Sequence, residues 1–89
     1  MKDYASMSDI EIDTMVSKIC SPEFHRNYCN NPADAWPIIT GSMISICPVG
    51  NDGQLWEASG MGGMKADYDK NPLRAAMVVF LMMKEEKND

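Results

Sequence analysis

The sequence predicts an α+β fold in which a small antiparallel sheet of two or three strands is covered by helices, in the order α-α-β-β-(β)-α. Three observations support this prediction. Residues 72–83 are apolar on almost every side of a helix, an amphipathic segment precedes Ser21-Pro22, and two segments rich in β-forming residues lie between them. The chain has 89 residues, enough for one domain. We expect this domain to span residues 1–89, with a flexible arm at 1–6 and a charged tail at 84–89.

The first helix is predicted to begin at a capping box formed by Ser8 and Glu11, whose side chains suit the free backbone N–H groups there. Met7 and Ile12 hold the two positions of a hydrophobic staple. Apolar residues then recur at the spacing of one buried helix face: Ile12, Met15, Val16, Ile19 and Cys20. Ser21-Pro22 ends the helix, because the residue before a proline disfavours helical backbone.

A second, shorter helix is predicted to begin at Asn31-Pro32, after an ordered connection at residues 23–30. Asn31 suits the N-cap, and Pro32 suits the first helical position, where no N–H is needed. Pro37 complicates this helix, because its ring opposes the carbonyl four residues earlier. We therefore expect a kink, or only one or two turns before Gly41.

The sheet is predicted to contain a hairpin. Residues 43–47 alternate and are rich in β-formers, Asp52-Gly53 is a turn signal, and residues 55–59 form the returning strand. Residues 65–68 offer a short third strand. Trp56 belongs to the second strand, and we expect it in the core.

The final helix is predicted to run from Pro72, capped by Asn71, to about Lys84. Its apolar residues lie on one face and also on the opposite side: Leu73, Ala76, Met77, Phe80 and Leu81, then Val78, Val79, Met82 and Met83. Such a helix needs a sheet on one flank and another helix or another subunit on the other. Because each buried Val, Leu or Met side chain contributes roughly 1.5 to 3 kcal/mol, we expect a homodimer through this helix. The alternative is a monomer in which the first two helices cover it.

The composition limits the classes of partner. The net charge is −5 with eight Lys and Arg, so we expect no nucleic acid as a partner. No apolar stretch approaches the roughly 18 to 20 residues of a membrane span, and the N-terminus lacks the apolar segment of a signal peptide. Three cysteines form no disulfide pattern and fit a reducing cytosol. We expect a cytoplasmic protein without a membrane partner.

The candidate chemistry is weak. Cys20, His25, Cys29 and Cys47 are ligand types for zinc, but their spacing is not that of a zinc motif, and buried thiols explain them better. His25 is the single imidazole, and Cys29 is its nearest nucleophilic partner. The two offer an enzyme as an alternative, but the sequence indicates no orienting acid. We predict no enzyme, no metal and no cofactor.

A recognition surface around Trp36 is an alternative to a structural role. Its neighbours Tyr28, Asn30, Asn31 and Asp34 gather polar groups about an aromatic ring. Capping by Asn31 and a turn at Asn30 explain much of this pattern. Both interpretations remain open from the residues alone.

The two Asn-Pro helix starts suggest a second feature. If they lie together, Arg74 in the first turn of the final helix would create an electropositive notch on an acidic molecule. An internal partner for Arg74, Asp34 or Asp69, is the favoured explanation, because a cation opposes the dipole at that helix end. The functional alternative is an acidic side chain or a small anion, recognised with help from Asn30, Tyr28 and Trp36.

Four segments together resemble the bacteriophage NinX-like family of small accessory proteins: residues 28–39, Ile44-Ser45-Ile46, Trp56-Glu57-Ala58 and residues 71–77. The likeness covers about residues 28–83, and more remotely the layout looks like the phage α-β-α sandwich domains. The resemblance implies expression inside an infected bacterium and brings no activity or site residue. We expect a phage accessory protein that acts by contact with a phage or host protein in the host cytoplasm. The alternatives are a small-molecule or anion-binding module and a small enzyme.

Overall fold

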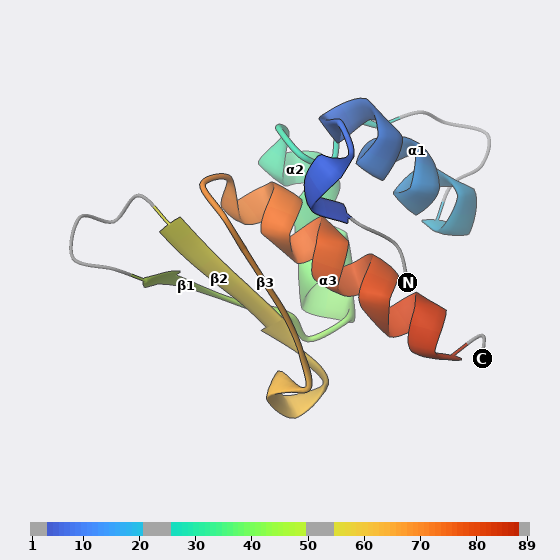
Figure 1. The fold of residues 1–89 in the computed structure, drawn as a ribbon. Helices are drawn as coiled ribbons and strands as arrows, with labels where there is room; N and C mark the ends of the chain where they lie inside the picture. The colour runs from blue at the N-terminus through green and yellow to red at the C-terminus, as the bar shows by residue number, and fades with distance from the viewer. Residues whose placement is uncertain (1–3, 21–25, 50–54, 88–89) are drawn as a thin grey trace.

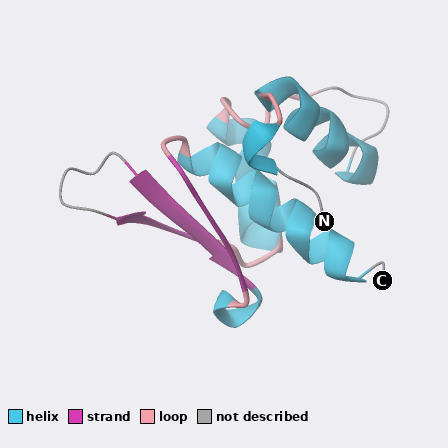
Figure 2. Cartoon of the chain, in the orientation of Figure 1, coloured by secondary structure: helices cyan, strands magenta, loops and turns pink. Residues whose placement is uncertain are grey.

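The computed structural model describes residues 4–20, 26–49 and 55–87 of the chain. Its elements follow the order α-α-β-β-β-α, with two short 3-10 turns added, and confirm the predicted α+β class (Figures 1 and 2). They are η1 (Tyr4–Ser6), α1 (Asp9–Cys20), α2 (Pro32–Gly41), β1 (Ser45–Val49), β2 (Leu55–Gly60), η2 (Met61–Gly63), β3 (Lys65–Asp69) and α3 (Pro72–Lys87). The optional third strand is therefore present.

The sheet has the strand order β1-β2-β3, and both pairs are antiparallel. Ala58, in the central strand, lies opposite Ile46 on one side and Asp67 on the other, and it is fully buried. Gly60 ends β2 where the sheet approaches α3. A Cβ atom there would lie 2.8 Å from Met83 Sδ and 3.2 Å from Val79 Cγ1. The sheet therefore packs directly on α3.

Helix α3 is the middle layer of the molecule, with the sheet on one side and α1 and α2 on the other (Figure 1). Every side chain from Ala75 to Leu81 is no more than 4% exposed. The apolar residues all round this helix are thus covered within one chain. This is the arrangement of the monomer alternative, so the reason for expecting a homodimer through α3 is removed, and self-association itself stays a prediction.

Helix α2 is longer than predicted. It spans Pro32–Gly41 with Pro37 inside it. Of the two expected alternatives, a kink or only one or two turns before Gly41, the short helix was therefore wrong. Pro37 and Ala33, whose carbonyl opposes the proline ring, are both exposed, and water can therefore replace the missing helix bond. Beyond the proline, the Thr40 hydroxyl donates to the Trp36 carbonyl at 3.0 Å, and Ser42 N–H donates to the Ile38 carbonyl at 2.9 Å.

The two ends of the chain contain more structure than the expected arm and tail. Tyr4 in η1 is buried, and α3 continues past Lys84 to Lys87. The sequence of this last turn consists of Lys and Glu, which are good helix formers. The predicted Ser21-Pro22 stop and Asp52-Gly53 turn lie outside the described residues, as does His25. Within the described residues, no helix is both long enough and apolar enough to cross a membrane.

Candidate functional site

The two Asn-Pro helix starts lie against each other. The side-chain amide of Asn71 donates to the carbonyl of Cys29 at 2.5 Å and to Oδ1 of Asn30 at 3.4 Å. The segment before α2 is therefore attached to the start of α3, 41 and 42 residues away in the chain. The proximity that the notch hypothesis requires is present.

Both asparagines also cap their helices, as predicted. Asn31 Oδ1 accepts from the N–H of Ala33 at 3.0 Å. Asn71 Oδ1 accepts from the N–H groups of Leu73 and Arg74, at 3.0 and 3.4 Å. The Asn71 side chain therefore makes hydrogen bonds to its own helix and to a remote segment, whereas the cap bond of Asn31 stays within its own helix.

Arg74 is held within the chain by four groups, and its side chain is only 11% exposed. Its Nη1 lies 2.6 Å from Asp9 Oδ1, and its Nε lies 3.4 Å from Asp69 Oδ2. Its Nη2 donates to the carbonyls of Tyr4 at 2.9 Å and Met7 at 2.5 Å. The positive charge is thus opposed by two carboxylates, which favours the internal bridge over a ligand site. We call this set of contacts the Arg74 junction.

The partners of Arg74 only partly match the sequence prediction. Asp69 is one of the two predicted partners, whereas Asp34 pairs with Arg26 instead. Asp9 was missed. It lies 65 residues from Arg74 in the chain, at the start of α1, where its position suits the helix dipole equally well. No local sequence pattern distinguishes an acid that only favours the helix dipole from one that also forms a remote ion pair.

Cys29 is unsuited to act as a nucleophile. It is fully buried, its N–H donates to Asp13 Oδ1 at 3.0 Å, and its thiol donates to the Asp9 carbonyl. Burial raises the pKa of the Cys29 thiol strongly, and the hydrogen bond and charge of Asp13 raise it further. These observations argue against an enzyme that uses His25 and Cys29.

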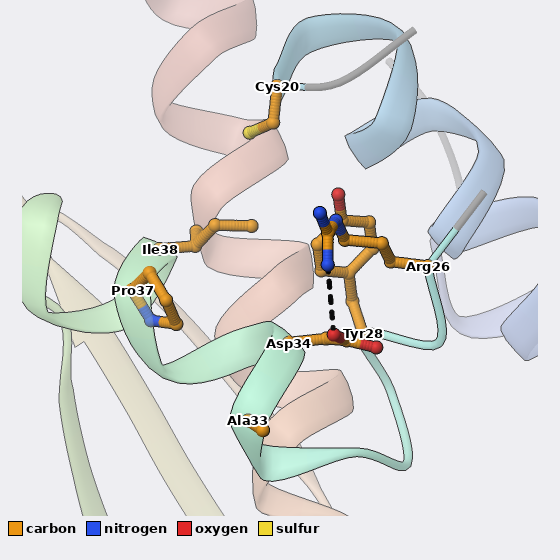
Figure 3. A pocket seen from close by; sticks show the side chains of 7 residues that line it. All are labelled: Cys20, Arg26, Tyr28, Ala33, Asp34, Pro37 and Ile38. Atoms are coloured by element: carbon orange, nitrogen blue, oxygen red, sulfur yellow. Dashed lines mark hydrogen bonds and ion pairs between the residues drawn. The ribbon is translucent and has the colours of Figure 1, made fainter. Parts of the chain in front are cut away.

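A groove of about 320 Å³ lies between the end of α1, residues 26–28 and α2 (Figure 3). We call it the α1–α2 groove. Its lining combines apolar side chains with one ion pair: Cys20, Arg26, Tyr28, Ala33, Asp34, Pro37 and Ile38. Tyr28 is buried and forms part of the wall. The groove is therefore a mixed surface on the helical side of the molecule.

The ion pair in the groove is asymmetric. Arg26 Nη1 lies 3.5 Å from Asp34 Oδ1, and the Arg26 side chain is 48% exposed, compared with 18% for Asp34. The other carboxylate oxygen of Asp34 accepts from the N–H of Asn27 at 3.2 Å. The carboxylate is thus fixed in the first turn of α2, while the Arg26 side chain is nearly half exposed.

The remainder of the lining is neutral. Burial raises the pKa of the Cys20 thiol, while the charge of Lys84 acts in the opposite direction. The thiol therefore stays protonated at neutral pH and behaves as a small, weakly polar group. Among the described residues, no group of three or more His, Cys, Asp or Glu side chains lies close enough to hold a metal ion.

Trp36 is on α2 but is not one of the residues that line the groove, and it is 58% exposed. It lies three residues after Ala33 and next to Pro37, and both of these residues line the groove and are exposed. The indole ring and the groove therefore belong to the same helix.

The predicted site residues divide between two places. Tyr28 and Asp34 lie in the α1–α2 groove, and Trp36 is exposed on the same helix as Asp34. Asn30 and Asn31 precede α2, and Asn30 contacts Asn71 at the start of α3, the helix that carries the largely buried Arg74. Arg26, Cys20 and Ile38 were missed by the sequence reasoning. They come from three separate segments and share no periodicity, so only an Arg–Asp pairing eight residues apart could have suggested part of this set.

The chain is similar to one known family. The family model described as Bacteriophage P22, NinX matches residues 3–84. No curated protein and no solved structure matches the chain significantly. The match includes both the Arg74 junction and the α1–α2 groove.

Proposed function

The chain belongs to the bacteriophage NinX family, and on that premise we propose that it is a phage accessory protein that binds another protein through the α1–α2 groove and Trp36. The place of action is the cytoplasm of the infected bacterium. The partner is a phage or host protein. The net charge of −5 supports a protein partner over a nucleic acid, because binding to phosphates needs a basic face.

The exposure of Trp36 is the observation that carries this proposal. A tryptophan that is 58% exposed on a regular helix leaves much of a large apolar ring in water. Tryptophan is among the residues most enriched where protein interfaces concentrate their binding energy. The other tryptophan, Trp56, is partly buried in β2 and has no comparable exposure.

The surroundings of Trp36 resemble the centre and rim of a protein interface. The groove, to which other residues of α2 contribute, provides an apolar wall, and the Arg26–Asp34 pair provides a polar edge. A small-molecule site is less well supported, because the groove volume of about 320 Å³ is at the lower limit for such sites. The proposal therefore favours a protein over a small ligand.

Affinity capture tests the proposal. The full chain would be used to capture and cross-link proteins in phage-infected cells, and a captured protein would then be purified. Its affinity would be measured by calorimetry for the parent, Trp36→Ala and Tyr68→Ala. Tyr68 is a matched control, since it is an aromatic residue that is 55% exposed on the sheet.

We expect Trp36→Ala to weaken binding by about 30-fold, which corresponds to about 2 kcal/mol, and Tyr68→Ala to change the affinity little. Equal affinity of the parent and Trp36→Ala for the purified partner would reject the proposed surface. Loss of binding in Tyr68→Ala alone would move the interface to the sheet.

A further inference from the structure

We propose that Met43, Met61 and Met83 form a binding site for a soft monovalent metal ion, Cu(I), through their thioether sulfurs. The site shares no lining residue with the α1–α2 groove and does not depend on the proposed function. The sequence prediction of no metal rested on cysteine and histidine, whereas methionine sulfur is a different kind of ligand.

A second hollow, of about 610 Å³, lies where the α2–β1 connection, the end of β2 and η2 meet α3. We call it the methionine hollow. Its long apolar side chains are all methionines, Met43, Met61 and Met83, and the rest of its described lining consists of Ser and Gly. None of these described lining residues is charged or carries an imidazole. An apolar ligand would be served equally well by leucine or isoleucine, so this composition favours a ligand that uses sulfur.

The three methionines meet around Gly60. A Cβ atom on Gly60 would lie 2.8 Å from Met83 Sδ and 3.7 Å from Ile44 Cγ1, so the Met83 sulfur lies beside this glycine and Ile44 is close to it. Met61 follows Gly60 in the chain, and Met43 precedes Ile44. The pairing of β1 with β2 keeps these two segments side by side. The Met83 sulfur therefore lies next to the chain neighbours of both other methionines.

The backbone at two of these methionines is strained. In the described part of the chain, the non-glycine residues with positive φ are Met43, at 56°, and Met61, at 54°. A long side chain rarely adopts this conformation, because it costs free energy, and such residues concentrate at functional sites and ligand clamps. Met43 is 84% exposed and Met61 is 40% exposed, so burial in the core does not explain either residue. Two positions that suit glycine thus carry a thioether at the same hollow.

The chemistry of the three sulfurs selects the metal. A thioether is a soft, uncharged ligand that suits Cu(I), whereas structural Zn²⁺ sites use thiolate, imidazole or carboxylate, and Mg²⁺ prefers oxygen. A methionine side chain has three rotatable bonds, and the hollow leaves room for the three sulfurs to turn toward one point. The net charge of −5 favours the approach of a cation.

A titration with Cu(I) tests the inference. Cu(I) is added without oxygen, as its acetonitrile complex, to the full chain carrying Cys20→Ser and Cys47→Ser, because these two exposed thiols are also soft ligands. Methionine methyl groups labelled with ¹³C report which sulfurs bind. On this parent, Met43→Leu and Met61→Leu each remove a sulfur and keep an apolar side chain. The matched control is Met64→Leu, since Met64 is 75% exposed and is not part of the hollow lining.

We expect one equivalent of Cu(I) to shift the methyl signals of Met43, Met61 and Met83 together, and Zn²⁺ to leave them unchanged. Met43→Leu and Met61→Leu should each weaken Cu(I) binding by about tenfold or more, whereas Met64→Leu should keep the parent affinity. Backbone amide spectra that match the parent outside the hollow show that each variant is folded.

Four results would overturn the inference. They are equal shifts with Zn²⁺, parent affinity for Cu(I) in either hollow variant, shifts confined to methionines outside the hollow, and no shift with Cu(I). A further titration with hexan-1-ol identifies the alternative occupant. If hexan-1-ol shifts the methyl signals of the hollow and Cu(I) does not, the hollow binds apolar molecules and the metal site is rejected.

Discussion

Arg74 and Arg26 both pair with aspartates, but the surroundings of the two side chains differ. Arg74 is 11% exposed, contacts Asp9 and Asp69, and also donates to two backbone carbonyls of the N-terminal segment. Arg26 is 48% exposed, and its contact with Asp34 spans 3.5 Å. Removal of a largely buried, multiply bonded cation leaves its partners unpaired and destabilises the fold, whereas removal of one member of an exposed ion pair costs little. The comparison therefore separates an arginine that the fold depends on from one at the surface.

The two Asn-Pro starts show the same difference. Asn71 bonds the first turn of α3 and also the segment before α2, whereas Asn31 bonds the first turn of α2. Asn71 is partly buried and Asn31 is exposed. Local sequence alone does not reveal this inequality, because both residues precede a proline and both cap a helix.

The largest effect is expected for Arg74→Gln. This change removes the positive charge between Asp9 and Asp69 and the bonds to the carbonyls of Tyr4 and Met7. The free energy of unfolding should fall by about 3 kcal/mol, as measured by urea denaturation.

Arg26→Gln is the matched control for that measurement, and it should cost less than about 1 kcal/mol because the pair is exposed. Similar losses for the two variants would break the distinction between the two arginines. In that case Arg26 would also be structural.

An intermediate effect is expected for Asn71→Ala. The change removes the cap of α3 and the bond to the carbonyl of Cys29, so unfolding should become easier by about 2 kcal/mol. Asn31→Ala removes one cap bond in an exposed position and should cost about 1 kcal/mol. Thermal melts of both variants show which one loses more stability. A greater loss for Asn31→Ala than for Asn71→Ala would contradict the prediction.

The smallest effect is expected for Asp67→Asn. This change tests whether the negative charge of Asp67, close to that of Asp69, destabilises the fold. Burial raises the pKa of Asp67 above its ordinary value of 3.8, and the charge of Asp69 raises it further, although Arg74 lowers it. When the pKa of an acid is raised by folding, ionisation of that acid makes the folded protein less stable relative to the unfolded chain. Its destabilising effect is therefore absent below about pH 3.8 and develops as the pH rises through the raised pKa.

Asp67→Asn should accordingly stabilise the protein at pH 7 by about 0.5 kcal/mol, a small value because the group is partly exposed to water. Urea denaturation at pH 7 and at pH 3.5 measures the difference between the variant and the parent. A gain that is the same at both pH values, or a loss at pH 7, would show that Asp67 has a different role.

The elements of the fold were predictable because their signals are local. The Ser8–Glu11 capping box is present, with the N–H of Glu11 donating to the Ser8 hydroxyl at 3.2 Å and the N–H of Ser8 donating to Glu11 Oε1 at 3.3 Å. The two asparagine caps form as expected. The length of α2 was not predictable from Pro37 alone, since the cost of a proline depends on whether water reaches the carbonyl that it leaves unpaired.

The candidate site was predictable only in part. Tyr28, Asp34 and Trp36 were predicted as site residues because polar and aromatic groups are adjacent in the sequence. The structure places Tyr28 and Asp34 in one groove and leaves Trp36 exposed on the same helix as Asp34. Cys20 and Arg26 belong to the same groove but come from other segments. Their contribution depends on how α1 and α2 pack on α3, and no periodicity encodes that packing.

The sequence by itself determined the family, the order of elements and the apolar character of α3, because caps, periodicity and motifs act over a few neighbouring residues. The tertiary structure decided that α1 and α2 cover α3, that Arg74 binds Asp9 and Asp69, and that Arg26 stays exposed beside Asp34. The physical reason is that an ion pair or a covered face depends on distances between residues far apart in the chain. Those distances are fixed only when the whole core is packed.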